Sequence, residues 1–210
     1  MNKLVRNVGL SALNMLGINR VLLRAKRSWP LALGYHGVTS NVGSQFIEDK
    51  HVTSEAFDRQ LAWLKRHCDV VDLPDYLEVV RRSRKRKRRV VTITFDDGYE
   101  NNLTCAVPVL EAHGMSACFF LTAGPIRDGC WLDHDLLPIS VRFSRKTWEA
   151  RVRDKTWLIA HDATAAKRQM IGREVKQAMS YLPWKEYVEL VHEFYRRTGR
   201  PEPPDEYAQF

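Results

Sequence analysis

The stretch Arg89–Gly98, "RVVTITFDDG", carries the strongest strand signal in the sequence. Its middle is a series of β-branched residues, a composition typical of strands. Because the run is almost continuously apolar and does not alternate, it predicts a strand buried on both faces, as in a parallel sheet. It ends in two adjacent aspartates, Asp96 and Asp97, followed by Gly98, which permits a tight turn or the close approach of a substrate.

The segments on either side of this strand alternate between strand and helix signals. A Thr or Ser cap and a helical spacing of apolar residues mark one helix, and a proline in the first turn marks another. This alternation predicts βα units, and therefore an α/β fold with a parallel sheet or barrel. Strands are expected over 30–38, 69–73, 89–98 and 116–124, and helices over 53–68, 74–82 and 101–114.

The alternation stops after Gly124. Two amphipathic patterns come next, over Thr164–Leu182 and Trp184–Arg197, and they predict helices of an insertion or small cap. The expected organisation is a basic amphipathic helix over 1–27, an α/β part over 28–124, a mainly helical insertion over 125–200 and a proline-rich linker over 201–210.

The net charge of +8 comes from one local run. Arg81–Arg89 reads "RRSRKRKRR", and without its eight basic residues the chain has 25 basic and 25 acidic residues. The run suits a solvated loop that leads into a strand, or a patch for an anionic polymer or lipid. No stacking aromatic, zinc-finger or helix-turn-helix pattern lies beside it, so nucleic-acid binding is only a minor option. The four cysteines form no C-x-x-C pair, which argues against a zinc ribbon or a disulfide framework.

The N-terminal segment Met1–Arg27 holds six basic residues and no acid. Its apolar residues recur at helical spacing, and Asn7, Asn14 and Arg20 interrupt any continuous apolar core, so we expect neither a signal sequence nor a membrane span there. Two alternatives stay open, a helix packed on the domain and a basic amphipathic helix on an anionic membrane surface. We expect a location in the cytoplasm or at the cytoplasmic face of the membrane.

The paired aspartates lie where ligands bind in parallel α/β folds, beyond the carboxyl end of a strand. Successive side chains at a strand end point in different directions, so Asp96 and Asp97 can have different roles. One carboxylate can hold a divalent cation while the other takes a proton from water. The alternative is a surface turn in which Asp-Gly only ends the strand.

"VVTITFDDGYENN", the downstream "VPVLEAHGMSACFFL" and the upstream "LALGYHGV" together resemble the polysaccharide deacetylases of the NodB-homology type, carbohydrate esterase family 4. The resemblance spans about residues 31–123, and "GCWLDHDLL" resembles the next segment in one branch of the family. It implies a partial, distorted (β/α) barrel with a helical insertion after the fourth strand. It also implies metal-dependent removal of acetyl groups from a carbohydrate polymer such as an exopolysaccharide.

The same resemblance implies roles for individual residues. Asp96 would be the general base and Asp97 a ligand of a divalent metal such as zinc, and the backbone N–H of Tyr99 would stabilise the oxyanion. The further residues expected to line the site or bind substrate are His36, Gly98, Trp131 and Asp133.

The sequence departs from the family in its histidines. Relatives complete the metal site with an H-x-x-x-H pair, whereas no two of the seven histidines here are four residues apart. We therefore expect the metal to be weakly held and the chain to be the N-terminal part of a longer enzyme. Asp133, His134 and Asp135 could serve as replacement ligands, although their spacing favours capping and loop roles.

Three alternatives to deacetylation by this chain stay open. The first is a non-catalytic protein of the same fold that binds a glycan or a partner. The second is phosphoryl transfer by a strand-end aspartate, which the adjacency of the two aspartates disfavours because haloacid-dehalogenase phosphatases separate theirs by one residue. The third is nucleic-acid or lipid binding by Arg81–Arg89.

Overall fold

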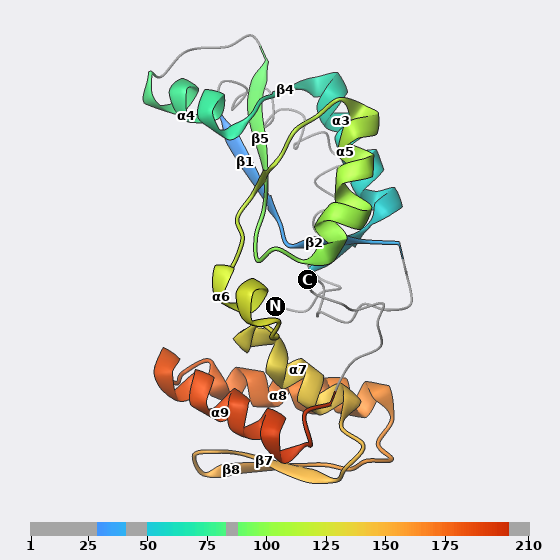
Figure 1. Ribbon diagram of the computed structural model, residues 1–210, viewed down its shortest axis with the longest axis vertical. Helices are drawn as coiled ribbons and strands as arrows, with labels where there is room; N and C mark the ends of the chain where they lie inside the picture. Colours follow the sequence, from blue (N-terminus) through green and yellow to red (C-terminus); the bar gives the residue numbers. More distant parts are fainter. Residues whose placement is uncertain (1–28, 41–49, 83–87, 202–210) are drawn as a thin grey trace, which may run out of the picture. The chain divides into compact units, whose positions relative to one another are not determined.

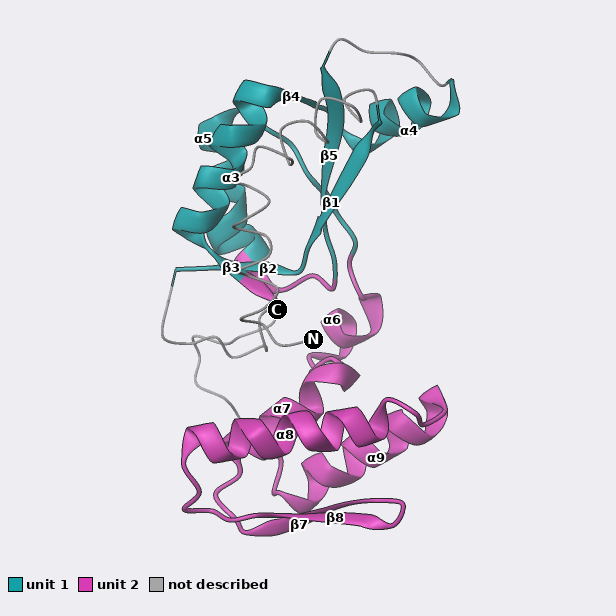
Figure 2. Ribbon diagram, turned by 180° about the vertical axis from the view of Figure 1, so that it is seen from behind, with its two compact units in different colours: residues 1–40, 52–96, 102–120 teal, residues 41–51, 97–101, 121–210 magenta. Residues whose placement is uncertain are grey.

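The computed structural model describes residues 29–40, 50–82 and 88–201, and the chain divides into two compact units. Of the described residues, the first unit contains 29–40, 52–82, 88–96 and 102–120, and the second contains 50–51, 97–101 and 121–201 (Figure 2). The predicted N-terminal helix, the middle of the basic run and nearly all of the linker lie outside the described residues.

The first unit is built on a parallel sheet with β5 (Arg89–Phe95) at its centre (Figure 1). β1 (Leu31–Tyr35), β4 (Cys68–Val70) and β6 (Cys118–Phe119) all pair with β5 in parallel. Five of the seven residues of β5 are buried, which confirms the prediction of a strand covered on both faces. The mixed α/β class is therefore confirmed, and the described strands form an open sheet that does not close into a barrel.

Three helices cover this sheet, and local signals explain where they begin and end. α3 (Ser54–His67) begins where the Thr53 hydroxyl accepts a hydrogen bond from the backbone N–H of Ala56, and it buries Phe57, Leu61 and Leu64 on one face. α4 (Leu73–Arg81) is capped by Asp72 in the same way. The π-helical turn η1 (Asn102–Ala106) leads into α5 (Val107–His113), which lies beside α3 (Figures 1 and 2). Two short strands, β2 (Gly37–Thr39) and β3 (His51–Thr53), pair with each other.

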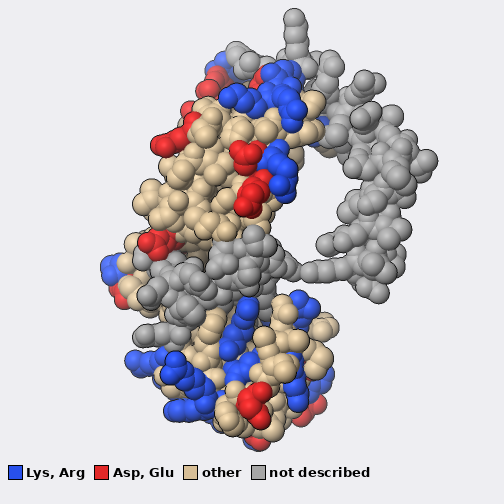
Figure 3. Space-filling model, turned by 90° about the vertical axis from the view of Figure 1, so that its right-hand side faces the viewer, with Lys and Arg blue, Asp and Glu red and all other residues tan. Residues whose placement is uncertain are grey.

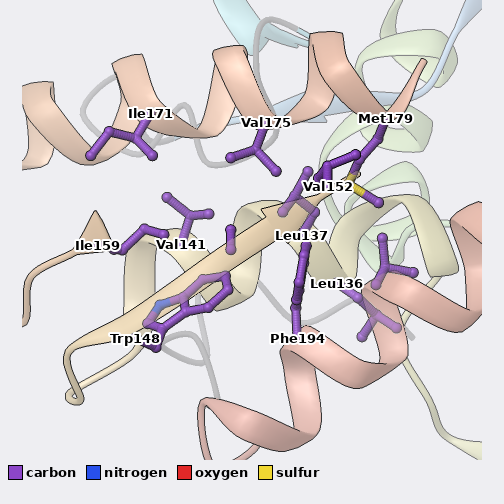
Figure 4. Close-up of a cluster of buried hydrophobic side chains, with 12 residues drawn as sticks. Leu136, Leu137, Val141, Trp148, Val152, Ile159, Ile171, Val175, Met179 and Phe194 are labelled. Atoms are coloured by element: carbon purple, nitrogen blue, oxygen red, sulfur yellow. The ribbon is translucent and has the colours of Figure 1, made fainter. Parts of the chain in front are cut away.

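The second unit combines helices with a hairpin. Its elements are α6 (Ala123–Asp128), α7 (Asp133–Phe143), β7 (Trp148–Val152), β8 (Lys155–Ile159), α8 (Ala165–Met179) and α9 (Trp184–Arg197). α8 and α9 confirm the two amphipathic predictions, whereas the antiparallel hairpin β7–β8 was not predicted. The hairpin, α7, α8 and α9 share one apolar core, in which the rings of Trp148 and Phe194 are 5.3 Å apart (Figure 4).

No helix in the described ranges combines the length and apolar character that crossing a membrane requires. All four cysteines lie in these ranges as free thiols. Cys68 is the buried one, and Cys118 is half-buried.

Candidate active site

Asp96 directly follows β5 and extends its pairing with β1. Its backbone N–H donates to the carbonyl oxygen of Tyr35 over 2.9 Å. Because Tyr35 pairs with Phe95, the next residues of the two strands, His36 and Asp96, lie at the same carboxyl edge of the sheet. Neighbouring strands are about 4.8 Å apart, so the structure brings these two predicted site residues side by side.

The backbone turns sharply at the next two residues. Asp97 has a φ of 76° and Gly98 a φ of 83°, which places both in the left-handed region. A Cβ atom at position 98 would lie 3.0 Å from Leu121 Cδ2 and 3.3 Å from Ile126 Cδ1. Gly98 is therefore required by the turn and by its neighbours together.

Tyr99 lies at the end of the turn and is 3% exposed. Its hydroxyl donates to Asp135 Oδ2 over 2.8 Å, and Lys50 Nζ is 3.2 Å from the other oxygen of this fully buried carboxylate. Burial raises the pKa of the Tyr99 phenol well above its ordinary range, and the negative charge of Asp135, its hydrogen bond and the charge of Asp97 raise this pKa further. Tyr99 therefore stays protonated and anchors the turn to α7.

His134, in the first turn of α7, brings an imidazole to the same place. Its Nε2 atom is 3.5 Å from Asp97 Oδ2 and 3.4 Å from the Tyr99 hydroxyl. A second histidine, His51, packs its ring edge-to-face on Tyr99 at 4.8 Å and has its Nδ1 atom 2.9 Å from Asn101 Nδ2. Two imidazoles and two carboxylates thus surround Tyr99 within the second unit.

A divalent metal is implied by the family resemblance, and the donors around Asp97 fit it only in part. Carboxylate oxygen and imidazole nitrogen are both ligands that zinc accepts, and Asp97 and His134 supply one of each. Within the described ranges, however, no three His, Cys, Asp or Glu side chains gather closely enough to hold an ion. Catalytic zinc sites typically use three protein ligands, so the described residues do not complete a metal site.

The remaining predicted site residues have structural contacts in the second unit. Asp133 Oδ1 is 2.8 Å from His192 Nε2, which links α7 to α9. Trp131 packs beside Tyr99 on the cluster that contains Leu132 and Ile139.

Sequence reasoning missed the residues that surround the turn. Lys50, His51 and Asn101 were not singled out, and Asp135 was expected to cap a helix or lie in a loop. The only sequence signal was the "DHD" of residues 133–135, which was weighed as a set of replacement ligands. Two of its three members do reach the motif turn, His134 and Asp135.

Comparison with known proteins identifies the relatives of this chain. The sequence model of the family described as "Polysaccharide deacetylase" matches residues 83–166, which include both aspartates, the turn and α7. Poly-β-1,6-N-acetyl-D-glucosamine N-deacetylase of Escherichia coli K12 is 28% identical over 120 residues, which are 55% of this chain and 17% of that protein. The protein of the same name from Staphylococcus epidermidis is 30% identical over 115 residues, 50% of this chain and 39% of that protein.

Among solved structures, the Streptococcus pyogenes deacetylase PplD in complex with acetate matches at 15% sequence identity with a TM-score of 0.43, over 80% of each chain. The chain spans less than half the length of the curated relatives it matches. Over residues 83–166, the chain is therefore similar to the polysaccharide deacetylases.

Proposed function

We propose that this chain removes acetyl groups from an N-acetylated glucosamine polymer, using the aspartates that follow β5. The proposal rests on the position of Asp96 and Asp97, which follow a buried parallel strand inside the segment that matches the deacetylase family. The substrate class comes from the relatives, whose names specify poly-β-1,6-N-acetyl-D-glucosamine. We also propose that the open sheet of the first unit is part of the distorted (β/α) barrel that the family resemblance implies.

Each residue of the motif has a role in the proposed reaction. Asp96 takes a proton from the water that attacks the acetamide carbonyl, and the proton then passes to the leaving amine, which yields acetate and a free amino group. The backbone N–H of Tyr99 donates to the developing oxyanion. A divalent metal, held through Asp97, would supply Lewis acidity, and because the described donors do not complete its ligand set, no step is derived through it.

Glycan deacetylation is tested by incubating the protein with a β-1,6-linked N-acetylglucosamine hexamer and measuring acetate and new primary amines. Zinc, cobalt or manganese is added in separate arms. We expect slow release that Asp96→Asn abolishes and that Glu100→Gln, a matched exposed acid four residues away, leaves unchanged. Release that survives Asp96→Asn would refute the assigned role of the base.

A second candidate is favoured because the described residues around Asp97 do not complete a metal-ligand set. The chain would then bind an acetylated glycan, or a partner protein, without turnover. Binding of the hexamer with no acetate above the blank in any metal arm would decide for this candidate.

Membrane association through residues 1–27 and a location in the cytoplasm or at the cytoplasmic membrane face also remain proposals. Basic side chains are visible on the face of the second unit drawn at the bottom of Figure 3, and such charge attracts anionic lipid. Nucleic acid is not a proposed partner. A flotation assay with phosphatidylserine vesicles, comparing the whole chain with one that lacks residues 1–27, tests the membrane proposal.

A further inference from the structure

A hollow of about 870 Å³ lies in the second unit, between the turn of the β7–β8 hairpin and α8. None of the residues of the candidate active site lines it. Its volume falls within the range of small-molecule sites. Residues 152–157 of the hairpin line one side, and Glu174, Gln177, Ala178 and Tyr181 line the other.

Two aromatic side chains line this hollow, and neither is fully buried in the core. The half-buried Trp157 donates its indole N–H to Glu174 Oε2 over 2.9 Å, which fixes the orientation of the ring. The Tyr181 side chain is 74% exposed, so packing does not account for it. A large, rigid ring with a polar atom at its edge provides contact area at little cost in conformational entropy, and it suits the apolar face of a sugar ring.

The charges around the hollow cancel. Arg153 and Lys155 are opposed by Asp154 and Glu174, so no net charge selects an anion or a nucleic acid. The remaining polar side chains, Thr156 and Gln177, are exposed and offer both donors and acceptors. The aliphatic lining is only Val152 and Ala178, too little for the apolar face of a helix.

We propose that this hollow is a glycan-binding site for a short, neutral, N-acetylated stretch of a polysaccharide, with sugar rings contacting Tyr181 and Trp157 and hydroxyl groups bonded to Thr156 and Gln177. The choice of N-acetylglucosamine as the sugar rests on the proposed function. The shape and chemistry of the hollow rest on the structure alone. Such a site would hold the polymer through units that do not react.

The test is a calorimetric titration of the whole chain with three probes. These are the neutral β-1,6-linked N-acetylglucosamine hexamer, its fully deacetylated cationic form, and heparin as an anionic polysaccharide. We expect the neutral hexamer to bind best, and Tyr181→Ala and Gln177→Ala each to raise its Kd by about tenfold, the loss of one aromatic or hydrogen-bonding contact. Trp184→Ala removes an aromatic residue that is 65% exposed and does not line the hollow, so this control should leave the Kd unchanged.

Each outcome supports or overturns the proposal. A Kd that is the same in the wild type and in both hollow variants places any binding elsewhere, and absence of hexamer binding also overturns the proposal. Tighter binding of heparin or of the cationic hexamer overturns the choice of a neutral ligand. Since binding and acetate release are measured separately, acetate release without binding in the hollow refutes this inference alone, whereas binding in the hollow without acetate release refutes only the proposed catalysis. Thermal melts of Tyr181→Ala and Gln177→Ala that match the wild type show that lost binding is not lost folding.

Discussion

Arg168 is a buried cation, and we expect its substitution to destabilise the second unit more than the substitution of any exposed residue. It lies in α8, is 6% exposed, and donates to five backbone carbonyl oxygens. Three of these belong to the C-terminal end of α7 and its cap, where helix carbonyls lack partners within the helix. The acceptors are Val141, Arg142 and Ser144 at 2.9 to 3.2 Å, His161 at 2.6 Å and Ala163 at 3.3 Å.

The expected cost depends on how many of these carbonyls lose their partner. Each buried polar group left without a hydrogen bond costs about 1–3 kcal/mol, and water can reach some of the five. We therefore expect Arg168→Met, which keeps most of the volume and loses every donor, to lower the free energy of unfolding by about 3–5 kcal/mol. Arg168→Lys keeps the charge on a single point donor and should cost about half of that.

Urea unfolding followed by tryptophan fluorescence measures these differences, since Trp148 and Trp157 belong to the unit that Arg168 supports. Arg173→Met, an exposed arginine in the same helix, is the matched control and should change stability by less than about 0.5 kcal/mol. A loss below about 1 kcal/mol in Arg168→Met, or an equal loss in Arg168→Lys, would refute the claim that the guanidinium network holds α7 and α8 together.

Three further predictions concern the motif turn and a helix cap. Tyr99→Phe leaves the buried Asp135 carboxylate with one fewer donor and should lower urea stability by about 1.5–3 kcal/mol, while Tyr181→Phe on the surface should not change it. The raised pKa of Tyr99 stabilises the folded state fully below about pH 10, and this stabilisation is lost at higher pH, where the tyrosine of the unfolded chain ionises. We therefore expect the free energy of unfolding to fall more steeply with alkaline pH in the wild type than in Tyr99→Phe. Gly98→Ala forces a Cβ into the left-handed region 3.0 Å from Leu121 and should cost about 1–2 kcal/mol, and an unchanged melting temperature would contradict the requirement for glycine. Thr53→Ala removes the cap of α3 and should cost about 1 kcal/mol by urea unfolding, which Thr53→Ser should restore.

The elements that could be predicted from the sequence are those with a strong local pattern. The β-branched run of β5, the capped, amphipathic α3 and the amphipathic α9 are found where expected, because their burial follows one periodicity over many residues. The β7–β8 hairpin was missed although Trp148, Ala150 and Val152 alternate with exposed residues, since four charged residues in β7 and its turn weaken the apolar signal.

The buried Asp135 could not be predicted, because its partners are remote in the sequence. Tyr99 lies 36 residues away and Lys50 lies 85 residues away, and no spacing rule connects residues over such distances. A carboxylate in the first turn of a helix is ordinarily a solvated group, and only the fold shows that this one is fully buried. The same holds for His134, whose approach to Asp97 depends on how α7 packs.

The two aspartates of the motif are therefore positioned by different sets of long-range contacts. Asp96 continues the β1–β5 ladder through the Tyr35 carbonyl, so its place depends on the register of the parallel sheet. Asp97 begins a left-handed turn that Tyr99, Asp135 and His134 hold against α7. Because the proposed base and the proposed ligand depend on separate packing, changes in α7 should disturb Asp97 and leave the strand-end pairing of Asp96 intact. The two adjacent like charges are thus tolerated because each carboxylate is held in place by its own set of contacts.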